Sequence, residues 1–195
     1  MSPELLNTRL SRRRLLQKAA LAGSALVISS TIGCGEEDRI VFNGQKETAS
    51  PAPEIVEGLD FEFSIQLTEL INQFRAQNGL NFLKVHAALA LAAKNYSEIL
   101  AQNDWFSHDS PNGSSPWDRM TQAGFPYNTF KGENLVKGDI QGDPQVFFDS
   151  LVESEGHKAN MLNPNYKFIG VACYIRNLTY PTRWCVQEFG GEYVE

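Results

Sequence analysis

The sequence contains few cysteines, few histidines and no long apolar run. Its 195 residues include three cysteines and three histidines. A dense disulfide framework is therefore excluded, and one cysteine has no partner if the other two pair. The longest uncharged and largely apolar stretch, residues 19–32, is shorter than the roughly 20 residues that cross a bilayer core. With 42% hydrophobic residues, the composition is that of one globular domain with a non-globular extension.

Basic residues are scarce after residue 34. Residues 1–34 hold five of the 17 basic residues but only one of the 23 acidic residues. The remaining part carries 12 basic and 22 acidic side chains, a net charge of about −10. An acidic surface repels phosphate backbones, so no nucleic-acid partner is expected.

The first 34 residues have the organisation of an export signal. The basic segment Ser11–Lys18 contains Arg12-Arg13-Arg14 followed by two leucines, and the apolar stretch 19–32 follows it. This order is typical of a signal peptide, and the paired arginines resemble the twin-arginine type. The alternative, an amphipathic helix of the domain, is disfavoured because residues 19–32 have no polar face at helical spacing. Residues 1–34 are therefore predicted to be a twin-arginine-type signal peptide.

The signal ends at a cysteine. Thr31-Ile32-Gly33-Cys34 resembles a bacterial lipobox, although Thr31 stands where the pattern prefers leucine. The resemblance implies that Cys34 is acylated and anchors the protein to a membrane. The alternative is an incidental cysteine near an ordinary cleavage site. Residues 35–58 are polar, contain Pro51 and Pro53, and are predicted to be a flexible tether.

The remaining residues, 59–195, predict an α+β domain. Apolar residues at helical spacing, together with Gly and Pro at the ends of these segments, predict four helices and three strands. The helices cover 61–78, 87–103, 116–123 and 144–154, and the strands cover 127–137, 166–175 and 181–190. Helices come early and no βαβ alternation is present, so a doubly wound sheet is not expected.

The last two strands are expected to form a hairpin that carries a disulfide. Cys173 and Cys185 are symmetric about Thr179, so antiparallel pairing around a tip at residues 178–180 places them opposite each other. Export would allow the bond to form. The alternative is two buried free thiols.

Several short motifs in this domain together resemble the CAP (SCP-like) family, in its bacterial branch. The resemblance covers roughly Phe63 to Gly190. It is carried by Leu70–Arg75 with Gly79-Leu80, Leu83 with His86, Leu89 and Ala93, Phe106-Ser107-His108, Gly132-Glu133-Asn134-Leu135, Ser154–Leu162 and Phe168–Val171.

The resemblance implies a three-layer α-β-α sandwich with a central antiparallel sheet. It also implies a cleft that contains His108, Glu133 and His157. A second glutamate of the eukaryotic branch is not carried over, because Ser154 and Leu151 occupy the matching positions of that motif. Whether Glu153 or Glu155 replaces it stays open.

Two imidazoles and a carboxylate are ligands that Zn²⁺ or another divalent cation accepts. The same groups can act as a general acid–base pair. The alternatives are structural: His108 only fixes its loop, Glu133 accepts hydrogen bonds from backbone amides, and His157 supports the turn into Asn160.

Three further polar residues near these motifs are interpreted as structural. Asn134 and Asn160 are interpreted as amides that hold loops, and His86 as a helix cap. A nucleophilic role for Ser154 is disfavoured, because no strand–turn–helix elbow surrounds it.

The favoured function is an exported, lipid-anchored binding module whose cleft holds a divalent cation, a lipid, or a peptide or glycan. The first alternative is a metal-assisted or His/Glu-dependent hydrolase of cell-envelope peptides, with His108, Glu133 and His157 as catalytic candidates. The second is a structural envelope lipoprotein that presents its domain to a protein partner. Fold alone does not decide among them.

Overall fold

A computed structural model describes residues 56–126 and 129–193. Its elements follow the chain as β1 (Gly58–Leu59), α1 (Phe61–Gln77), β2 (Lys84–Val85), α2 (Ala87–Asn103), α3 (Pro116–Gln122), β3 (Thr129–Asp139), α4 (Pro144–Glu153), α5 (Glu155–Met161), β4 (Tyr166–Arg176) and β5 (Thr182–Tyr193). The predicted signal peptide, Cys34 and most of the predicted tether lie outside the described residues. Within them, no helix is both long and apolar enough to span a membrane.

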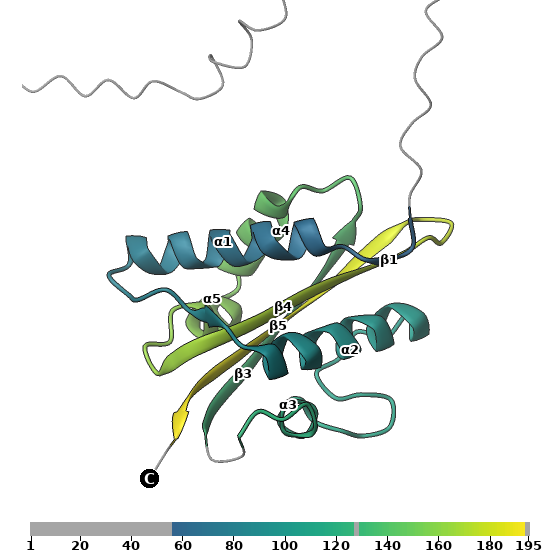
Figure 1. Ribbon diagram of the computed structural model, residues 1–195. Helices are drawn as coiled ribbons and strands as arrows, with labels where there is room; N and C mark the ends of the chain where they lie inside the picture. The colour runs from purple at the N-terminus through teal and green to yellow at the C-terminus, as the bar shows by residue number, and fades with distance from the viewer. Residues whose placement is uncertain (1–55, 127–128, 194–195) are drawn as a thin grey trace, which may run out of the picture. The chain divides into compact units, whose positions relative to one another are not determined.

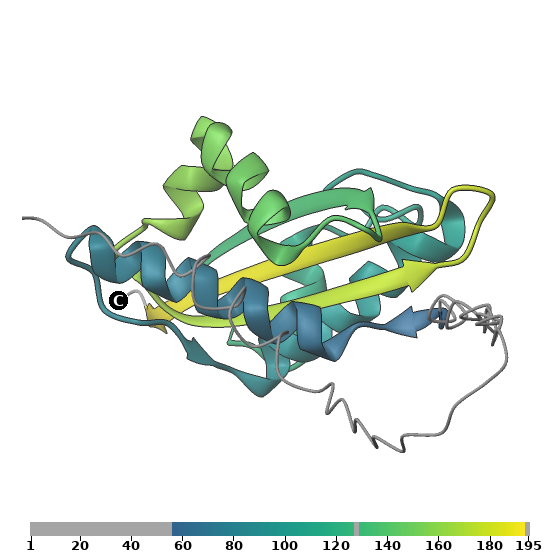
Figure 2. The same ribbon diagram turned by 90° about the horizontal axis from the view of Figure 1, so that it is seen from above.

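The strands form one sheet with helices on both faces. The strand order is β1-β4-β5-β3, and β2 pairs with β4 as well. All pairs are antiparallel except the two-residue contact of β2 with β4. Helices α1, α4 and α5 cover one face, and α2 and α3 cover the other (Figures 1 and 2). The predicted α+β class and the three-layer sandwich are confirmed.

Each long helix begins at a side chain that caps it. The carboxylate of Asp60 accepts a hydrogen bond from the backbone N–H of Phe63, at 3.1 Å. At the start of α2, Nδ1 of His86 accepts one from the N–H of Ala88, at 3.2 Å. Such acceptors satisfy backbone donors that have no partner within the helix. The interpretation of His86 as a helix cap is confirmed.

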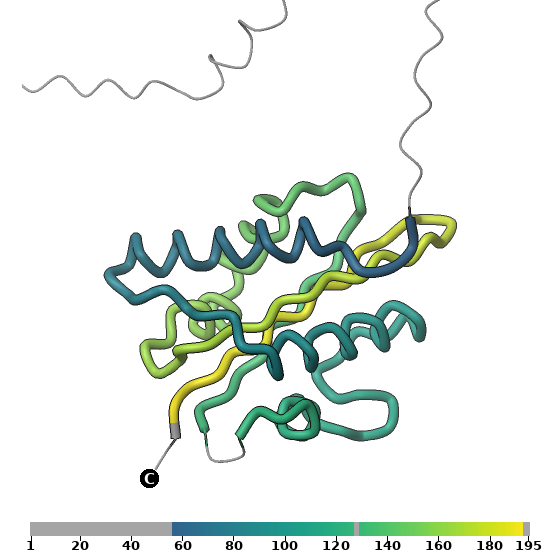
Figure 3. The backbone as a smooth tube through the Cα atoms, in the orientation of Figure 1, coloured from purple at the N-terminus to yellow at the C-terminus, as the bar shows by residue number. Residues whose placement is uncertain are grey.

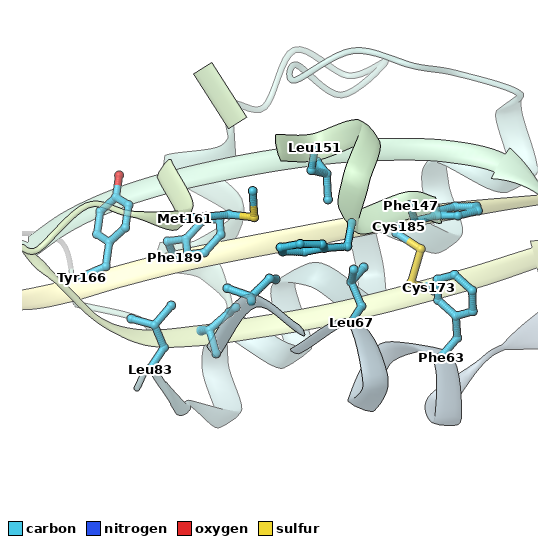
Figure 4. Close-up of a cluster of buried hydrophobic side chains, with 13 residues drawn as sticks. Phe63, Leu67, Leu83, Phe147, Leu151, Met161, Tyr166, Cys173, Cys185 and Phe189 are labelled. Atoms are coloured by element: carbon cyan, nitrogen blue, oxygen red, sulfur yellow. A yellow bond between two sulfur atoms is a disulfide. The ribbon is translucent and has the colours of Figure 1, made fainter. Parts of the chain in front are cut away.

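The core on the α1 side contains the disulfide. Cys173 and Cys185 are paired directly across β4 and β5, are bonded to each other and are fully buried. Phe63 and Phe147 pack edge to face, 4.9 Å between ring centroids, close to the disulfide (Figure 4). The predicted pairing is therefore confirmed, and the alternative of free thiols is wrong.

A buried arginine fixes the segment that follows α5. The guanidinium of Arg75, in α1, donates to the carbonyl oxygens of Asn81 at 3.0 Å, Met161 at 2.8 Å and Asn163 at 3.0 Å. Arg75 is 1% exposed, and each of these bonds replaces a hydrogen bond to water that the guanidinium loses on burial. These bonds tie α5, which carries His157, to α1.

Three elements were not expected from the sequence. Helix α5 spans only seven residues and has one buried side chain, Met161, so it has no apolar periodicity to detect. Strands β1 and β2 have two residues each and exist because they pair with the outer edge of β4. The trace in Figure 3 shows how the links around α1 bring both of them to that edge. The predicted strand 127–137 corresponds to β3, which extends to Asp139.

Candidate functional site

A hollow of about 670 Å³ lies beside α3 and β3. Its lining combines an aromatic ring, a cation and several polar groups: His108, Asp109, Ser115, Pro116, Trp117, Lys131, Gly132, Glu133 and Asn160. Ser115 and Asp118 form a capping box and Pro116 occupies the first turn of α3, which sets the position of Trp117 at the rim. The indole is 50% exposed, so a large apolar surface faces the solvent there.

Glu133 stands at the base of this hollow and joins two other side chains. Its Oε1 lies 2.7 Å from Nδ1 of His108, and its Oε2 accepts a hydrogen bond from Nη2 of Arg119 at 2.6 Å. The Glu133 side chain is 1% exposed and that of His108 is 56% exposed. Because a carboxylate only accepts, Nδ1 of His108 donates, and no described residue forms a hydrogen bond with Nε2. The imidazole is thus oriented from the protein side and open to a ligand.

Arg119 holds the loop that carries His108. Its guanidinium donates to the carbonyl oxygen of His108 at 2.9 Å, to that of Ser114 at 2.8 Å and to Oγ of Ser110 at 3.0 Å. It also lies 3.3 Å from the ring centroid of Tyr96, a cation–π contact. The planar guanidinium suits this arrangement because it donates in several fixed directions.

The charges shift the titration of the site. The hydrogen bond that His108 donates to Glu133 raises the pKa of His108 above its usual value, although burial opposes this. Burial raises the pKa of Tyr96 to about 12, so this phenol is neutral at physiological pH. Burial also lowers the pKa of Lys131. His108 is therefore the group of the hollow whose charge changes most readily near neutral pH.

His157 lies on α5 and does not line the hollow. Its pKa is lowered by burial and then by the charge of His108, so the two imidazoles are near enough to interact electrostatically. Its carbonyl oxygen accepts a hydrogen bond from Nδ2 of Asn134 at 3.1 Å. Asn160 donates to the Glu133 carbonyl at 3.2 Å and to Oδ1 of Asn134 at 2.9 Å. The two amides hold β3 and α5 together.

The three predicted site residues are thus arranged unequally. His108 and Glu133 are in contact, while His157 is a neighbour outside the lining. Both oxygens of Glu133 already form hydrogen bonds with His108 and Arg119, so a metal ion at Glu133 would have to compete with these partners. In the described part of the chain, no three His, Cys, Asp or Glu side chains form a group that could hold a metal ion. A Zn²⁺ or other divalent-cation site stays an untested prediction.

Two residues of the site were missed by sequence reasoning. Arg119 lies in the short α3, where a charged residue is ordinarily a solvated one. Glu188 lies in β5 directly opposite Glu133, inside an otherwise uncharged run from Trp184 to Phe189 in which every residue is buried. The single acidic residue in this otherwise uncharged run was the sequence signal that could have identified Glu188. Glu153 and Glu155 are both exposed, and neither lines the hollow.

Comparisons with known proteins concern the family and the fold of the chain. Residues 68–189 match the model of the CAP family, described as the cysteine-rich secretory protein family. The chain is 35% identical over 135 residues to the uncharacterized protein YkwD of Bacillus subtilis, covering 65% of this chain and 51% of YkwD. It is 31% identical over 106 residues to the uncharacterized membrane protein YlbC of the same organism, covering 54% of this chain and 30% of YlbC. The chain therefore spans about half or less of the curated relatives that it matches.

Solved structures share the fold. An outer surface protein of Borrelia burgdorferi superposes with a TM-score of 0.61 at 21% identity, covering 71% of this chain and 99% of that one. An extracellular protein of Bacillus anthracis that contains an SCP domain superposes with a TM-score of 0.57 at 24% identity, covering 67% and 41%. The family model spans more than half of the sequence. The chain belongs to the cysteine-rich secretory protein (CAP) family.

Proposed function

We propose that this chain is an exported, lipid-anchored binding module that holds a peptidoglycan-type fragment, a glycan with an attached peptide, in the hollow at His108. The observation that carries the proposal is that the oriented imidazole of His108 and the half-exposed indole of Trp117 line the same hollow. Export and the anchor rest on residues 1–34 and Cys34.

The lining suits a ligand with both apolar and polar faces. The Trp117 ring, 50% exposed, offers a flat apolar surface, and His108 offers a ring nitrogen that no described residue binds. Ligand sites commonly combine an aromatic surface with a few placed polar groups. The C–H faces of a sugar ring fit the indole, and sugar hydroxyls or peptide amides fit the polar lining.

Two basic side chains of the lining favour a ligand that carries a carboxylate; of the two acidic residues beside them, Glu133 is paired with Arg119 and Asp109 opposes such a ligand. His108 has a raised pKa, so it is protonated over a wider pH range than an ordinary histidine. Lys131 lines the same hollow. A charge-assisted hydrogen bond from an imidazolium to a ligand carboxylate is about twice as strong as a neutral one.

Isothermal titration calorimetry with a soluble muropeptide, in the presence of EDTA, tests the proposal. Separate measurements with the disaccharide and with the stem peptide identify the part that binds. We expect Trp117→Ala and His108→Ala each to weaken binding at least about tenfold, or about 1.4 kcal/mol. Phe82→Ala is the matched control, because Phe82 is 61% exposed and does not line the hollow. Absence of binding, or equal loss in all three variants, would contradict the proposal.

A second candidate is favoured by one observation, the 2.7 Å contact between His108 and Glu133. A carboxylate that orients an imidazole is the base half of a hydrolytic site. His108 would take a proton from a water that attacks an amide carbonyl, and would return it to the leaving amine. Mass spectrometry of muropeptides incubated with the protein tests this: cleavage should disappear in His108→Gln. If the muropeptides stay intact with the wild-type protein, the hydrolase function is contradicted and binding alone remains as the proposal.

A further inference from the structure

Glu188 is a buried acid that neither candidate function uses. It lies in β5 and is 0% exposed. Both of its carboxylate oxygens are buried, and neither accepts a hydrogen bond from a described residue. An ionised carboxylate in that condition would cost several kcal/mol, so its protonation state requires an explanation.

Its position in the sheet places it beside Glu133. Glu188 is opposite Glu133 of β3 and opposite Gly170 of β4. Directly opposed residues point to the same face of a sheet. A Cβ at Gly170 would meet the backbone of Leu89 and Ala90, so this face is the one that α2 covers. The two glutamates therefore lie side by side under α2.

The buried charges around the pair do not balance two anions. Arg119 of α3 is the buried cation that contacts Glu133, at 2.6 Å. His108 is more than half exposed, and Tyr96 of α2, with a pKa of about 12, is neutral. Asp109 is exposed and adds a negative charge. Two carboxylates that share one buried cation cannot both stay ionised without repelling each other.

We propose that Glu188 carries a proton at neutral pH and donates it in a hydrogen bond to the carboxylate of Glu133. The pair then bears one negative charge. Glu133 receives donors from His108, Arg119 and Glu188, which fixes its orientation. Glu188 is thus a positioning residue that acts on His108 through Glu133.

The energetics of burial agree with this assignment. Burial, and then the negative charge of Glu133, raise the pKa of Glu188 well above the ordinary value. The consequence for ligand binding rests on the proposed function. The protonation of Glu188 can be measured in the ligand-free protein, so a failure of this proposal can be distinguished from a failure of the proposed function.

Infrared spectroscopy and NMR of the purified ligand-free protein, with EDTA present, test the proposal. At neutral pH we expect an infrared band of a protonated carboxyl that is lost in Glu188→Gln. The glutamine amide is neutral and can donate to Glu133, so the pKa of His108, followed through its ring C–H resonance, should stay unchanged. Glu188→Leu removes the donor, makes Glu133 a stronger acceptor and should raise the pKa of His108.

A variant of another glutamate in the same strand serves as the control. Glu192→Gln changes an exposed residue of the same strand and should alter neither signal. If Glu188 is ionised instead, the wild-type band is absent, and Glu188→Gln lowers the pKa of His108 because a nearby negative charge is lost. Either result overturns the proposal. The wild-type band decides the matter even if the variants do not fold.

Discussion

At His108, proton uptake is linked to folding. The folded-state pKa of His108 is raised above its usual value of 6.5, so protonation stabilises the folded state. That contribution is fully present below the unfolded-state pKa and is lost as the pH rises through the folded-state pKa. The pKa of His157 is lowered, so this residue acts in the opposite direction: it costs stability as the pH falls through 6.5.

A comparison of the wild-type protein with His108→Gln isolates the first effect, because His157 is present in both. We predict that the wild-type advantage in free energy of unfolding is largest below about pH 6.5 and shrinks at higher pH. Urea unfolding from about pH 5 to about pH 9 measures it. A difference that is independent of pH would show that the bond to Glu133 does not shift the titration of His108.

A second prediction concerns the contribution of Arg119 to stability. Arg119→Ala leaves the carboxylate of Glu133, 1% exposed, without its buried cation. Removing one partner of a buried ion pair costs about 3–5 kcal/mol, and urea unfolding should show a loss of that order. Lys94→Ala is the control, because Lys94 and Glu98 form an exposed pair at 4.0 Å; its loss should be below about 1 kcal/mol. Equal losses in both variants would contradict the assigned role of Arg119.

The sequence predicted part of this site. His108 and Glu133 were predicted because they stand in short motifs, Phe106-Ser107-His108 and Gly132-Glu133-Asn134-Leu135, that resemble motifs of the family. Arg119 and Glu188 were not found, because their roles depend on the burial that packing creates and not on their spacing along the chain. His157 was expected inside the cleft, but α5 places it beside the hollow.

Among the elements, the contact of α2 with β4 depends on a glycine. A Cβ at Gly170 would lie 2.1 Å from the carbonyl carbon of Leu89 and 2.2 Å from the backbone nitrogen of Ala90. Backbone atoms cannot rotate away, so α2 would have to shift. Glycine here permits a close helix–sheet approach.

Gly170→Ala should therefore destabilise the fold by about 3 kcal/mol or more, the upper part of the range for overpacked cores. The matched control is Gly156→Ala in α5, where an added Cβ meets nothing within 4 Å and alanine is the better helix former. Thermal unfolding of both variants measures the difference. A Gly170→Ala protein as stable as the Gly156→Ala protein would contradict the packing described for α2.

The elements that periodicity predicted are the long ones. Helices α1, α2 and α4 bury one face each, which leaves regular apolar spacing. The hairpin of β4 and β5 lies between two layers of helices, so its strands are largely apolar runs. Strands β1 and β2 and helix α5 bury few side chains. Tertiary contacts with β4 and the bonds of Arg75 stabilise them, and a local sequence pattern does not record these contacts.

For the whole molecule, the predicted acylation of Cys34 has a direct test. Intact-mass analysis of protein from the membrane fraction of a bacterial host should show a diacylglyceryl adduct on Cys34. The adduct should be absent in Cys34→Ala, because no other cysteine is available: Cys173 and Cys185 are bonded to each other. An unmodified protein released into the medium would contradict the anchor and leave export alone.

The binding proposal also distinguishes two surfaces of the domain. The hollow at His108 is polar and aromatic, whereas an apolar groove with Ile65 and Leu91 in its lining lies between α1 and α2. A glycan with an attached peptide matches the first surface, because its hydroxyls and carboxylates would lose hydrogen bonds in the second.

The most direct test is an NMR titration of the ¹⁵N-labelled protein with a soluble muropeptide. Binding in the hollow predicts saturable shifts at the Trp117 indole N–H, the His108 ring and the Asn160 amide. Signals of Ile65 and Leu91 should stay in place. An absence of shifts at His108 and Trp117, or shifts confined to the apolar groove, would contradict the proposed function.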